Sequence, residues 1–363
     1  MNIVWPDRKL VDLIGTKLPI IQAPMAGVSG SQMAISVSEA GGLGSLPCAM
    51  LDSAKARAEL AIMRQGTEKP VNVNFFCHTP ALPDAARDTA WRELLSDYYE
   101  AFDLDVSAVK PAARRLPFDD EMCRVVEEHK PEVVSFHFGL PNKTLLSRVK
   151  DCGCIVLSSA TTVEEALWLE ANGVDAIIAQ GYEAGGHRGM FLTTDIATQP
   201  GTLALVPQVV DAVSVPVVAA GGIADGRGIA AAFALGASGV QIGTAYLFAP
   251  ESLIPKLYRE ALGRATDSAT ALTNLFSGRP ARALVNRVMR EVGPISKLAP
   301  EFPNAGAALA PLKAKAEESG LTDFSSIWAG QSAGLGRMAG AGDLTRQLAL
   351  HAEECLSNLR SID

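Results

Sequence analysis

The segment of residues 180–189, QGYEAGGHRG, gathers the polar side chains best suited to chemistry. It follows an apolar run at 176–180 that is typical of a buried strand. The imidazole of His187 can gain or lose a proton near neutral pH, and Gly185 and Gly186 allow the backbone to bend it over a flat ring. The sequence therefore predicts His187 as an acid/base residue. The other histidines lack such a loop and are interpreted as surface or structural residues: His78, His129, His137 and His351.

Two glycine-rich turns could hold an anion. Residues 221–226 read GGIADG, with Gly221 and Gly222 at the start, and residues 241–244 read QIGT. Without side chains, the backbone N–H groups can approach a phosphate closely, and Thr244 adds a hydroxyl. This pattern predicts a bound phosphate monoester. The alternative, that these glycines only permit tight turns, stays open.

A third set of residues suits an aromatic ring. Ala23, Pro24 and Met25 form an apolar shelf, while the amides of Asn74 and Gln180 could hydrogen-bond the edge of a heterocycle. Together they predict an aromatic cofactor. Pro24 and Met25 would fit equally well as plain core residues.

Eight short β-rich runs must position these groups, and stretches with helical period separate most of them. The runs lie at 19–25, 42–47, 70–76, 132–138, 154–159, 176–180, 215–220 and 239–245, and the helical stretches at 31–40, 54–65, 142–151, 162–173, 203–213 and 226–236. Continuous Val/Ile/Ala runs alternating with helices indicate a parallel sheet covered by helices. Eight such units predict a closed (β/α)8 TIM barrel, whose catalytic loops follow the strands. An open doubly wound sheet is the alternative, but AGVSGSQ after the first run lacks its glycine fingerprint.

Two segments exceed a minimal barrel. We expect residues 1–262 to form the barrel, with an insertion at about 77–131, and residues 263–363 to form a mainly helical C-terminal region. Both additions are expected to cover the mouth of the barrel and the substrate.

Bulk properties exclude several classes of function. A formal net charge of −8 without a basic block argues against nucleic-acid binding. No apolar run reaches the roughly 18 residues of a membrane helix, and the first residues lack a secretory signal, so a cytoplasmic location is expected. The six scattered cysteines are interpreted as reduced thiols, and no metal site is predicted.

Two features of the C-terminal region need separate interpretation. Gly334, Gly336 and Gly340 imitate a nucleotide-binding pattern but follow no strand, so we reject that reading. The second is a polar group that fits either an ion-paired scaffold or an anion clamp at the mouth: Arg279, Arg282, Asn286 and Arg287.

Seven blocks in order resemble the nitronate monooxygenases, formerly called 2-nitropropane dioxygenases. They are PIIQAPMAG (19–27), PVNVNFFCHTP (70–80), QGYEAGGHRG (180–189), AAGGIADGRG (219–228), QIGTAYL (241–247), FSGRPARALVNR (276–287) and WAGQ (328–331). The resemblance spans nearly the whole chain.

The resemblance implies noncovalent FMN, a monomer or homodimer, and His187 as the catalytic histidine. It also implies oxidation of an alkyl nitronate of the propionate 3-nitronate type, with dioxygen, to a carbonyl compound and nitrite. The FMN contacts it implies are Ala23, Pro24, Met25, Asn74, Gln180, Gly185, Gly222, Gln241, Ile242, Gly243 and Thr244, to which the glycine turn adds Gly221.

The sequence departs from the family in residues 296–315, where Phe302, Ala305 and Lys313 do not reproduce the usual tyrosines and basic residue. The exact substrate therefore stays open. The flavin-dependent enoyl-acyl carrier protein reductases and NADH:quinone reductases resemble the same scaffold, and a non-catalytic phospholigand-binding barrel is the remaining alternative.

Overall fold

Eight parallel strands of the described chain close into a barrel. The structure is a computed structural model that describes residues 4–106, 109 and 115–360. In chain order the strands are β1 (Ile20–Gln22), β2 (Gly44–Pro47), β3 (Val71–Phe76), β4 (Val133–His137), β5 (Ile155–Ala160), β6 (Ala176–Gln180), β8 (Val217–Ala220) and β9 (Gly239–Ile242). Strand β1 pairs with β9, and a parallel bridge between Ile21 and Leu43 joins β1 to the start of β2, so the sheet closes. Each strand lies at one of the expected apolar runs, and the predicted (β/α)8 barrel is confirmed.

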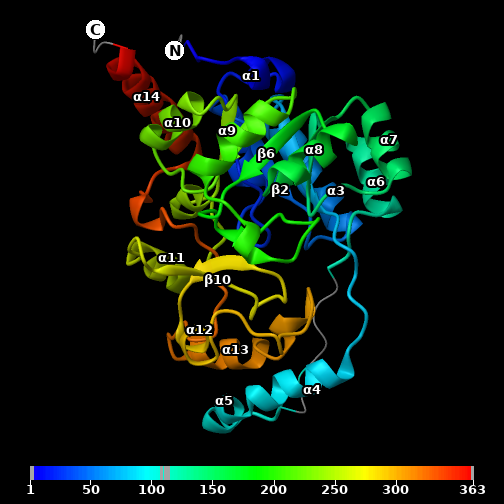
Figure 1. Cartoon of the computed structure of the whole chain (residues 1–363), viewed down its shortest axis with the longest axis vertical. Helices are drawn as coiled ribbons and strands as arrows, with labels where there is room; N and C mark the ends of the chain where they lie inside the picture. The colour runs from blue at the N-terminus through cyan, green and yellow to red at the C-terminus, as the bar shows by residue number, and fades with distance from the viewer. Residues whose placement is uncertain (1–3, 107–108, 110–114, 361–363) are drawn as a thin grey trace.

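A ring of helices surrounds the barrel (Figure 1). It contains α2 (Ser31–Glu39), α3 (Ser53–Gly66), α6 (Asp120–His129), α7 (Lys143–Asp151), α8 (Val163–Ala171), α9 (Thr202–Ala212) and α10 (Gly226–Ala234). Helix α14 (Ala341–Arg360), at the end of the chain, packs against α10 and α2. The eighth position of the ring is therefore filled by the C-terminal helix.

Apolar side chains fill the barrel from its N-terminal end. Helix α1 (Lys9–Ile14) buries Leu10 and Ile14 against strand residues such as Ile21 and Val218. Each such side chain contributes about 1.5–3 kcal/mol relative to leaving it exposed. The amino ends of the strands are thus closed, which leaves their carboxyl ends as the open face.

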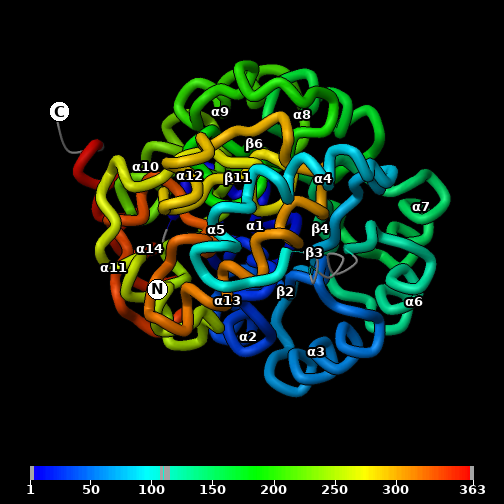
Figure 2. Tube along the Cα trace, turned by 90° about the horizontal axis from the view of Figure 1, so that it is seen from below, coloured from blue at the N-terminus to red at the C-terminus, as the bar shows by residue number. Residues whose placement is uncertain are grey.

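A second layer covers that open face, below the barrel in Figure 1 and in front of it in Figure 2. It holds the antiparallel sheet β10–β11–β7, formed by β7 (Gly186–His187), β10 (Thr270–Thr273) and β11 (Ala281–Leu284). Its helices are α4 (Ala85–Leu94), α5 (Ser96–Ala101), α11 (Lys256–Gly263), α12 (Arg287–Glu291) and α13 (Ala310–Glu318). Short 3-10 turns lie at Ile196–Thr198, Thr244–Phe248, Asn304–Ala307 and Ala333–Leu335.

The insertion and the C-terminal segment share one apolar core. Trp91 on α4 and Tyr99 on α5 pack in the same buried cluster as Leu312 on α13. The Trp91 indole donates a hydrogen bond to the Ala305 carbonyl at 3.0 Å, and the Tyr99 hydroxyl donates to the Ala308 carbonyl at 2.5 Å. These two segments, far apart in sequence, therefore form one layer.

The sequence predicts a mainly helical C-terminal region over the mouth, and two features of the structure bear on that prediction. The region contributes β10 and β11, and α14 lies on the side of the barrel rather than over its mouth. The division of the chain near residue 262 stays a prediction.

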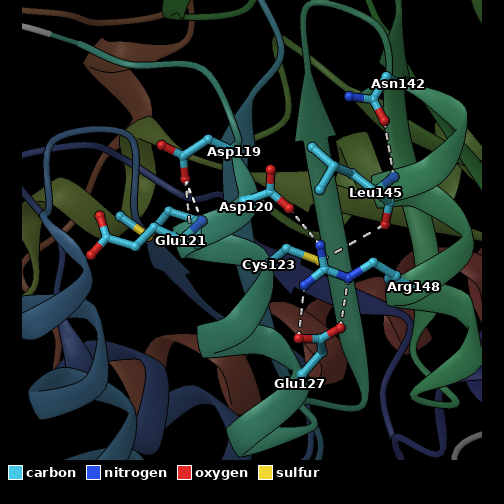
Figure 3. A network of polar contacts seen from close by, with 9 residues as sticks. Asp119, Asp120, Glu121, Cys123, Glu127, Asn142, Leu145 and Arg148 are labelled. Atoms are coloured by element: carbon cyan, nitrogen blue, oxygen red, sulfur yellow. Dashed lines mark hydrogen bonds and ion pairs between the residues drawn. The ribbon is translucent and has the colours of Figure 1, made fainter.

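A polar network joins α6 to α7 where the chain re-enters the barrel after the insertion (Figure 3). Arg148 donates to both oxygens of Glu127 at 2.7 and 2.9 Å and to Asp120 at 2.6 Å. These groups are partly exposed, so the network adds little stability but fixes the relative position of the two helices. In the part of the chain that the structure describes, no helix is both long and apolar enough to cross a bilayer.

Candidate active site

A large cavity opens at the carboxyl ends of the barrel strands. Its empty space, including the part open to solvent, is about 1380 Å³. Ligand sites of TIM barrels lie at this face of the fold. The predicted site residues that line it are Ala23, Pro24, Met25, Asn74, Gln180, Gly185, His187, Gly221, Gly222, Gln241, Gly243 and Thr244.

Ile242 is the one expected contact that does not appear among the described lining residues. Its side chain is 1% exposed in the apolar cluster that it shares with helix residues such as Ile229, and its carbonyl accepts a hydrogen bond from Ala23 N at 2.8 Å. Successive residues of a strand point to opposite faces, and Gln241 lines the cavity. Ile242 therefore supports the site through packing and backbone hydrogen bonding.

Strand β7 places His187 beneath the covering layer. His187 pairs with Ala281 of β11, and its Nε2 lies 2.8 Å from the Ser277 hydroxyl. Ser277 donates to the Arg279 carbonyl at 3.3 Å, so its oxygen is available to accept the Nε2–H of His187. This arrangement fits the tautomer with the proton on Nε2 and a free lone pair on Nδ1.

Burial and cationic neighbours keep the His187 ring neutral. Burial is the main cause that lowers its pKa well below the ordinary 6.5, followed by the positive field of Arg115. The rings of Trp328 and Phe302 lie 5.3 and 5.5 Å from the imidazole, centroid to centroid. A neutral imidazole in an aromatic pocket can accept a proton or a hydrogen bond at neutral pH.

The loop that carries His187 is held by its own polar residues. The Gln180 amide accepts from Gly189 N at 2.7 Å and donates to the His187 carbonyl at 3.0 Å. Arg188 is fully buried and donates to the Gln180 carbonyl and to the Gln199 side chain, and burial lowers its pKa to about 10. Gln180 thus lines the cavity, but its amide groups mainly fix the position of His187.

A buried carboxylate holds the far end of the same loop. Thr162 caps α8 by accepting from Glu165 N at 3.2 Å, as a capping box requires. The Glu165 carboxylate, however, accepts from the backbone and hydroxyl of Thr161 and from the amides of Phe191 and Leu192. It therefore connects α8 to the His187 loop and does not accept from the backbone N–H of Thr162, as the second hydrogen bond of a capping box would require.

The glycine turns approach other backbone closely. A Cβ added at Gly185 would lie 2.5 Å from Gly330 N, and Gly221 and Gly222 have φ of +112° and +72°. Asp225 caps α10, and the Glu183 carboxylate accepts from Thr202 N at the start of α9. Since these helix ends already have acceptors, an anion bound at this place would have to meet the turn itself and Gly243–Thr244.

One polar atom at the bottom of the cavity has no partner among the described residues. This atom is Oε1 of Gln241, which is buried although its residue lines the cavity. A buried acceptor without a hydrogen bond costs about 1–3 kcal/mol. A ligand with an N–H group would satisfy it. Nearby, Asn74 donates to the Ser135 carbonyl and hydroxyl at 3.1 and 3.0 Å.

Sequence reasoning overlooked several residues of the site. His137 lines the cavity and contacts the Ser159 hydroxyl and the His187 carbonyl, although it was interpreted as structural or surface. Phe76 and Arg115, both from the stretch around the insertion, line it too. Phe76 lies in the family block 70–80, but no local pattern assigns any of the three to the cavity, because distant segments of the chain bring them together.

The polar group of the C-terminal region divides into two roles. Arg282 is almost fully buried and donates to the Tyr182 carbonyl at 3.0 and 3.1 Å, and Asn286 caps α12. Arg287 pairs with Glu291 at 3.0 Å. Arg279 instead lies over the Phe138 ring at 4.1 Å and contributes to the low pKa of His187. The first three residues are scaffold, while Arg279 adds positive charge to the site.

The fold and cavity define an enzyme of the TIM-barrel class, with a histidine and two glycine turns at the carboxyl ends of its strands. The nitronate monooxygenase family model matches residues 7–351. The chain belongs to the nitronate monooxygenase family.

Relatives and solved structures agree with this assignment. The chain is similar to a nitronate monooxygenase of Pseudomonas aeruginosa, 44% identical over 93% of this chain and 96% of the relative. It is also similar to one of Paraburkholderia phytofirmans, 41% identical over 97% of both chains. A nitroalkane oxidase from Streptomyces ansochromogenes superposes with a TM-score of 0.88 at 39% identity, covering 97% and 99% of the two chains. FabK from Thermotoga maritima superposes with a TM-score of 0.75 at 30% identity over 99% and 100%.

Proposed function

We propose that this enzyme oxidises alkyl nitronates of the propionate 3-nitronate type, using FMN and dioxygen, to a carbonyl compound and nitrite. The observation that carries the proposal is the position of His187, a neutral imidazole among aromatic rings and arginines in the cavity. An anionic substrate suits such a site, because its charge meets cations in a partly dry environment.

The residues present fit FMN. The turn at Gly221–Gly222, with Gly243 and Thr244, offers room and donors for the phosphate monoester. The unpartnered Oε1 of Gln241 fits an N–H on the edge of the isoalloxazine, and Ala23, Pro24 and Met25 offer an apolar shelf for its rings. When bound, FMN supplies the two-electron redox chemistry that no protein side chain here provides.

The protein residues handle charge and protons. His187 Nδ1, left free by the Nε2 contact with Ser277, is placed to accept a proton or hold the substrate. Arg115 and Arg279 stabilise negative charge, and Trp328 and Phe76 keep water from the reacting face.

The first experiment adds propionate 3-nitronate to the purified protein without oxygen, follows the flavin bands, and then measures nitrite after air is readmitted. We expect a yellow protein that bleaches and then forms nitrite. In His187→Ala, the rate of both steps should fall about 100-fold or more, as expected when a general acid/base is removed. His129→Ala, on the outer helix α6, serves as the control and should match the wild type.

A second candidate function is an NAD(P)H-dependent flavin reductase, which the likeness to FabK favours. Protein that ignores nitronates but bleaches with NADH or NADPH would replace the proposed reaction with this one. An unchanged rate in His187→Ala would refute the role given to that residue.

A further inference from the structure

The cavity contains an arginine whose charge no described acidic residue neutralises. Arg115 lines the cavity, and none of the ion pairs among the described residues involves it. Its guanidinium carbon lies 5.8 Å from the centre of the Phe302 ring, at the side of the pocket that also holds His187. Arg115 is partly buried, and burial lowers its pKa. A partly desolvated cation without an acidic neighbour favours an anionic ligand.

The backbone of Arg115 is held in place. His78 Nε2 lies 3.1 Å from the Arg115 carbonyl, and because a carbonyl only accepts, the proton is on Nε2. The His78 ring packs edge-on against Phe302 at 4.8 Å. His78 therefore positions the residue, while the guanidinium remains the group that can contact a ligand.

A second arginine, Arg279, adds positive charge near His187. Arg279 lies over Phe138, and its Nη2 donates weakly to the Met190 carbonyl at 3.4 Å. Its Nη1 is buried and has no partner among the residues that the structure describes. Burial is the main cause that lowers the pKa of both His78 and His187, and the positive fields of Arg115 and Arg279 lower it further. The substrate side of the cavity is thus strongly electropositive.

We propose that Arg115 is a specificity-determining residue that binds a carboxylate at the end of the substrate opposite the nitronate. This inference rests on the proposed function, since it assigns the nitronate to the His187 end. A planar guanidinium matches a carboxylate because it can donate two parallel hydrogen bonds to it. The glycine turns proposed for the FMN phosphate follow β8 and β9, so Arg115 is a separate anion-binding group. Phe302 contacts both Arg115 and His187, so its ring lies between the proposed carboxylate end and the proposed nitronate end of the substrate.

The proposed binding of a carboxylate by Arg115 can be tested without catalytic turnover. Succinate has the shape and double charge of propionate 3-nitronate but cannot be oxidised by this route. Calorimetric titration of the holoenzyme should give an affinity for succinate that falls about 10- to 100-fold in Arg115→Met, the range expected for a charge-assisted hydrogen bond. Arg115→Lys keeps the positive charge but lacks the two parallel N–H donors of the guanidinium. Its affinity for succinate should therefore fall less than that of Arg115→Met. Arg346→Met, which removes an exposed charge on α14, should bind like the wild type.

Kinetics with two substrates then shows whether Arg115 recognises the carboxylate end of the substrate. In Arg115→Met, kcat/KM should fall about 10- to 100-fold for propionate 3-nitronate and less than about threefold for the uncharged-tail nitronate of 1-nitropropane. An equal fall for both substrates, or succinate binding that does not differ between wild type and Arg115→Met, overturns the proposal. Wild-type protein that oxidises neither nitronate refutes the proposed function instead, and the succinate titration still decides the role of Arg115.

Discussion

The hydrogen bond between Ser277 and His187 should control catalysis through the tautomer of the imidazole. Ser277 is 1% exposed, and its oxygen lies 2.8 Å from His187 Nε2. It accepts from the Arg279 amide at 3.4 Å and donates to the Arg279 carbonyl at 3.3 Å. With its one donor used on a carbonyl, Ser277 accepts the Nε2–H and keeps Nδ1 free as the base.

Replacing Ser277 with alanine removes this acceptor and leaves a buried N–H unsatisfied. Such a group costs about 1–3 kcal/mol, and each 1.36 kcal/mol of transition-state stabilisation is tenfold in rate. We therefore expect kcat/KM to fall by roughly 5- to 150-fold in Ser277→Ala. Most of the loss should be in kcat, because FMN and the substrate keep their other contacts.

The assay combines steady-state nitronate oxidation with nitrogen NMR of the histidine rings. Wild-type His187 should show a protonated Nε2 and a bare Nδ1, and Ser277→Ala a mixture of tautomers. Ser325→Ala is the matched control, since Ser325 is equally buried but donates to Glu317 in the covering layer. Kinetics of Ser277→Ala equal to those of this control, with an unchanged tautomer, would refute the reasoning.

Two further predictions follow from the same geometry. Gly185→Ala should purify with less FMN and a lower melting temperature, because its Cβ would lie 2.5 Å from Gly330 N; normal flavin content in the absorption spectrum would contradict this. The free energy of unfolding should fall as the pH drops from about 6.5 to 4. The pKa values of His78 and His137 are lowered to about 4 by burial, so the unfolded chain binds protons in that window that the folded chain does not. Each histidine should account for about 3 kcal/mol at most by pH 4. Urea titrations of the wild type and His137→Asn measure this, and equal pH dependence of the two proteins would exclude a contribution from His137.

Much of the barrel could be predicted because its signals are local. The apolar strand runs and the helical stretches such as 54–65 follow from residue periodicity, and the structure places α3 at Ser53–Gly66. The position of α14 could not be predicted from the sequence, because an amphipathic helix can pack equally well over the mouth of a barrel or against its side. Packing against α2 and α10, more than a hundred residues away in sequence, decides this.

The residues of the site also divide into those that a local sequence pattern predicts and those that it does not. The glycine turns and His187 are marked by their place after strands, and the structure brings them to one cavity. Ile242 could have been separated from Gln241 by strand alternation, because only one of two neighbours can face the cavity. Ser277 lies in the family block 276–287, but nothing there marks it as a partner of His187. Arg115 and His137 lie outside the family blocks, and only the closed fold brings them to the same cavity.

The charges around the site point to the chemistry more strongly than any single residue. Arg188 and Arg282 are buried against backbone carbonyls, which offsets their desolvation and makes them scaffold. Arg115 forms no ion pair with the described acidic residues, and the buried Nη1 of Arg279 has no hydrogen-bond acceptor among the described residues. Burial lowers the pKa values of His78 and His187, and the positive fields of both arginines lower them further. A fold that leaves cations uncompensated at one place loses stability there unless a ligand supplies the missing negative charge. An anionic substrate provides that charge only while bound, so the same arginines that weaken the empty site strengthen binding of the substrate.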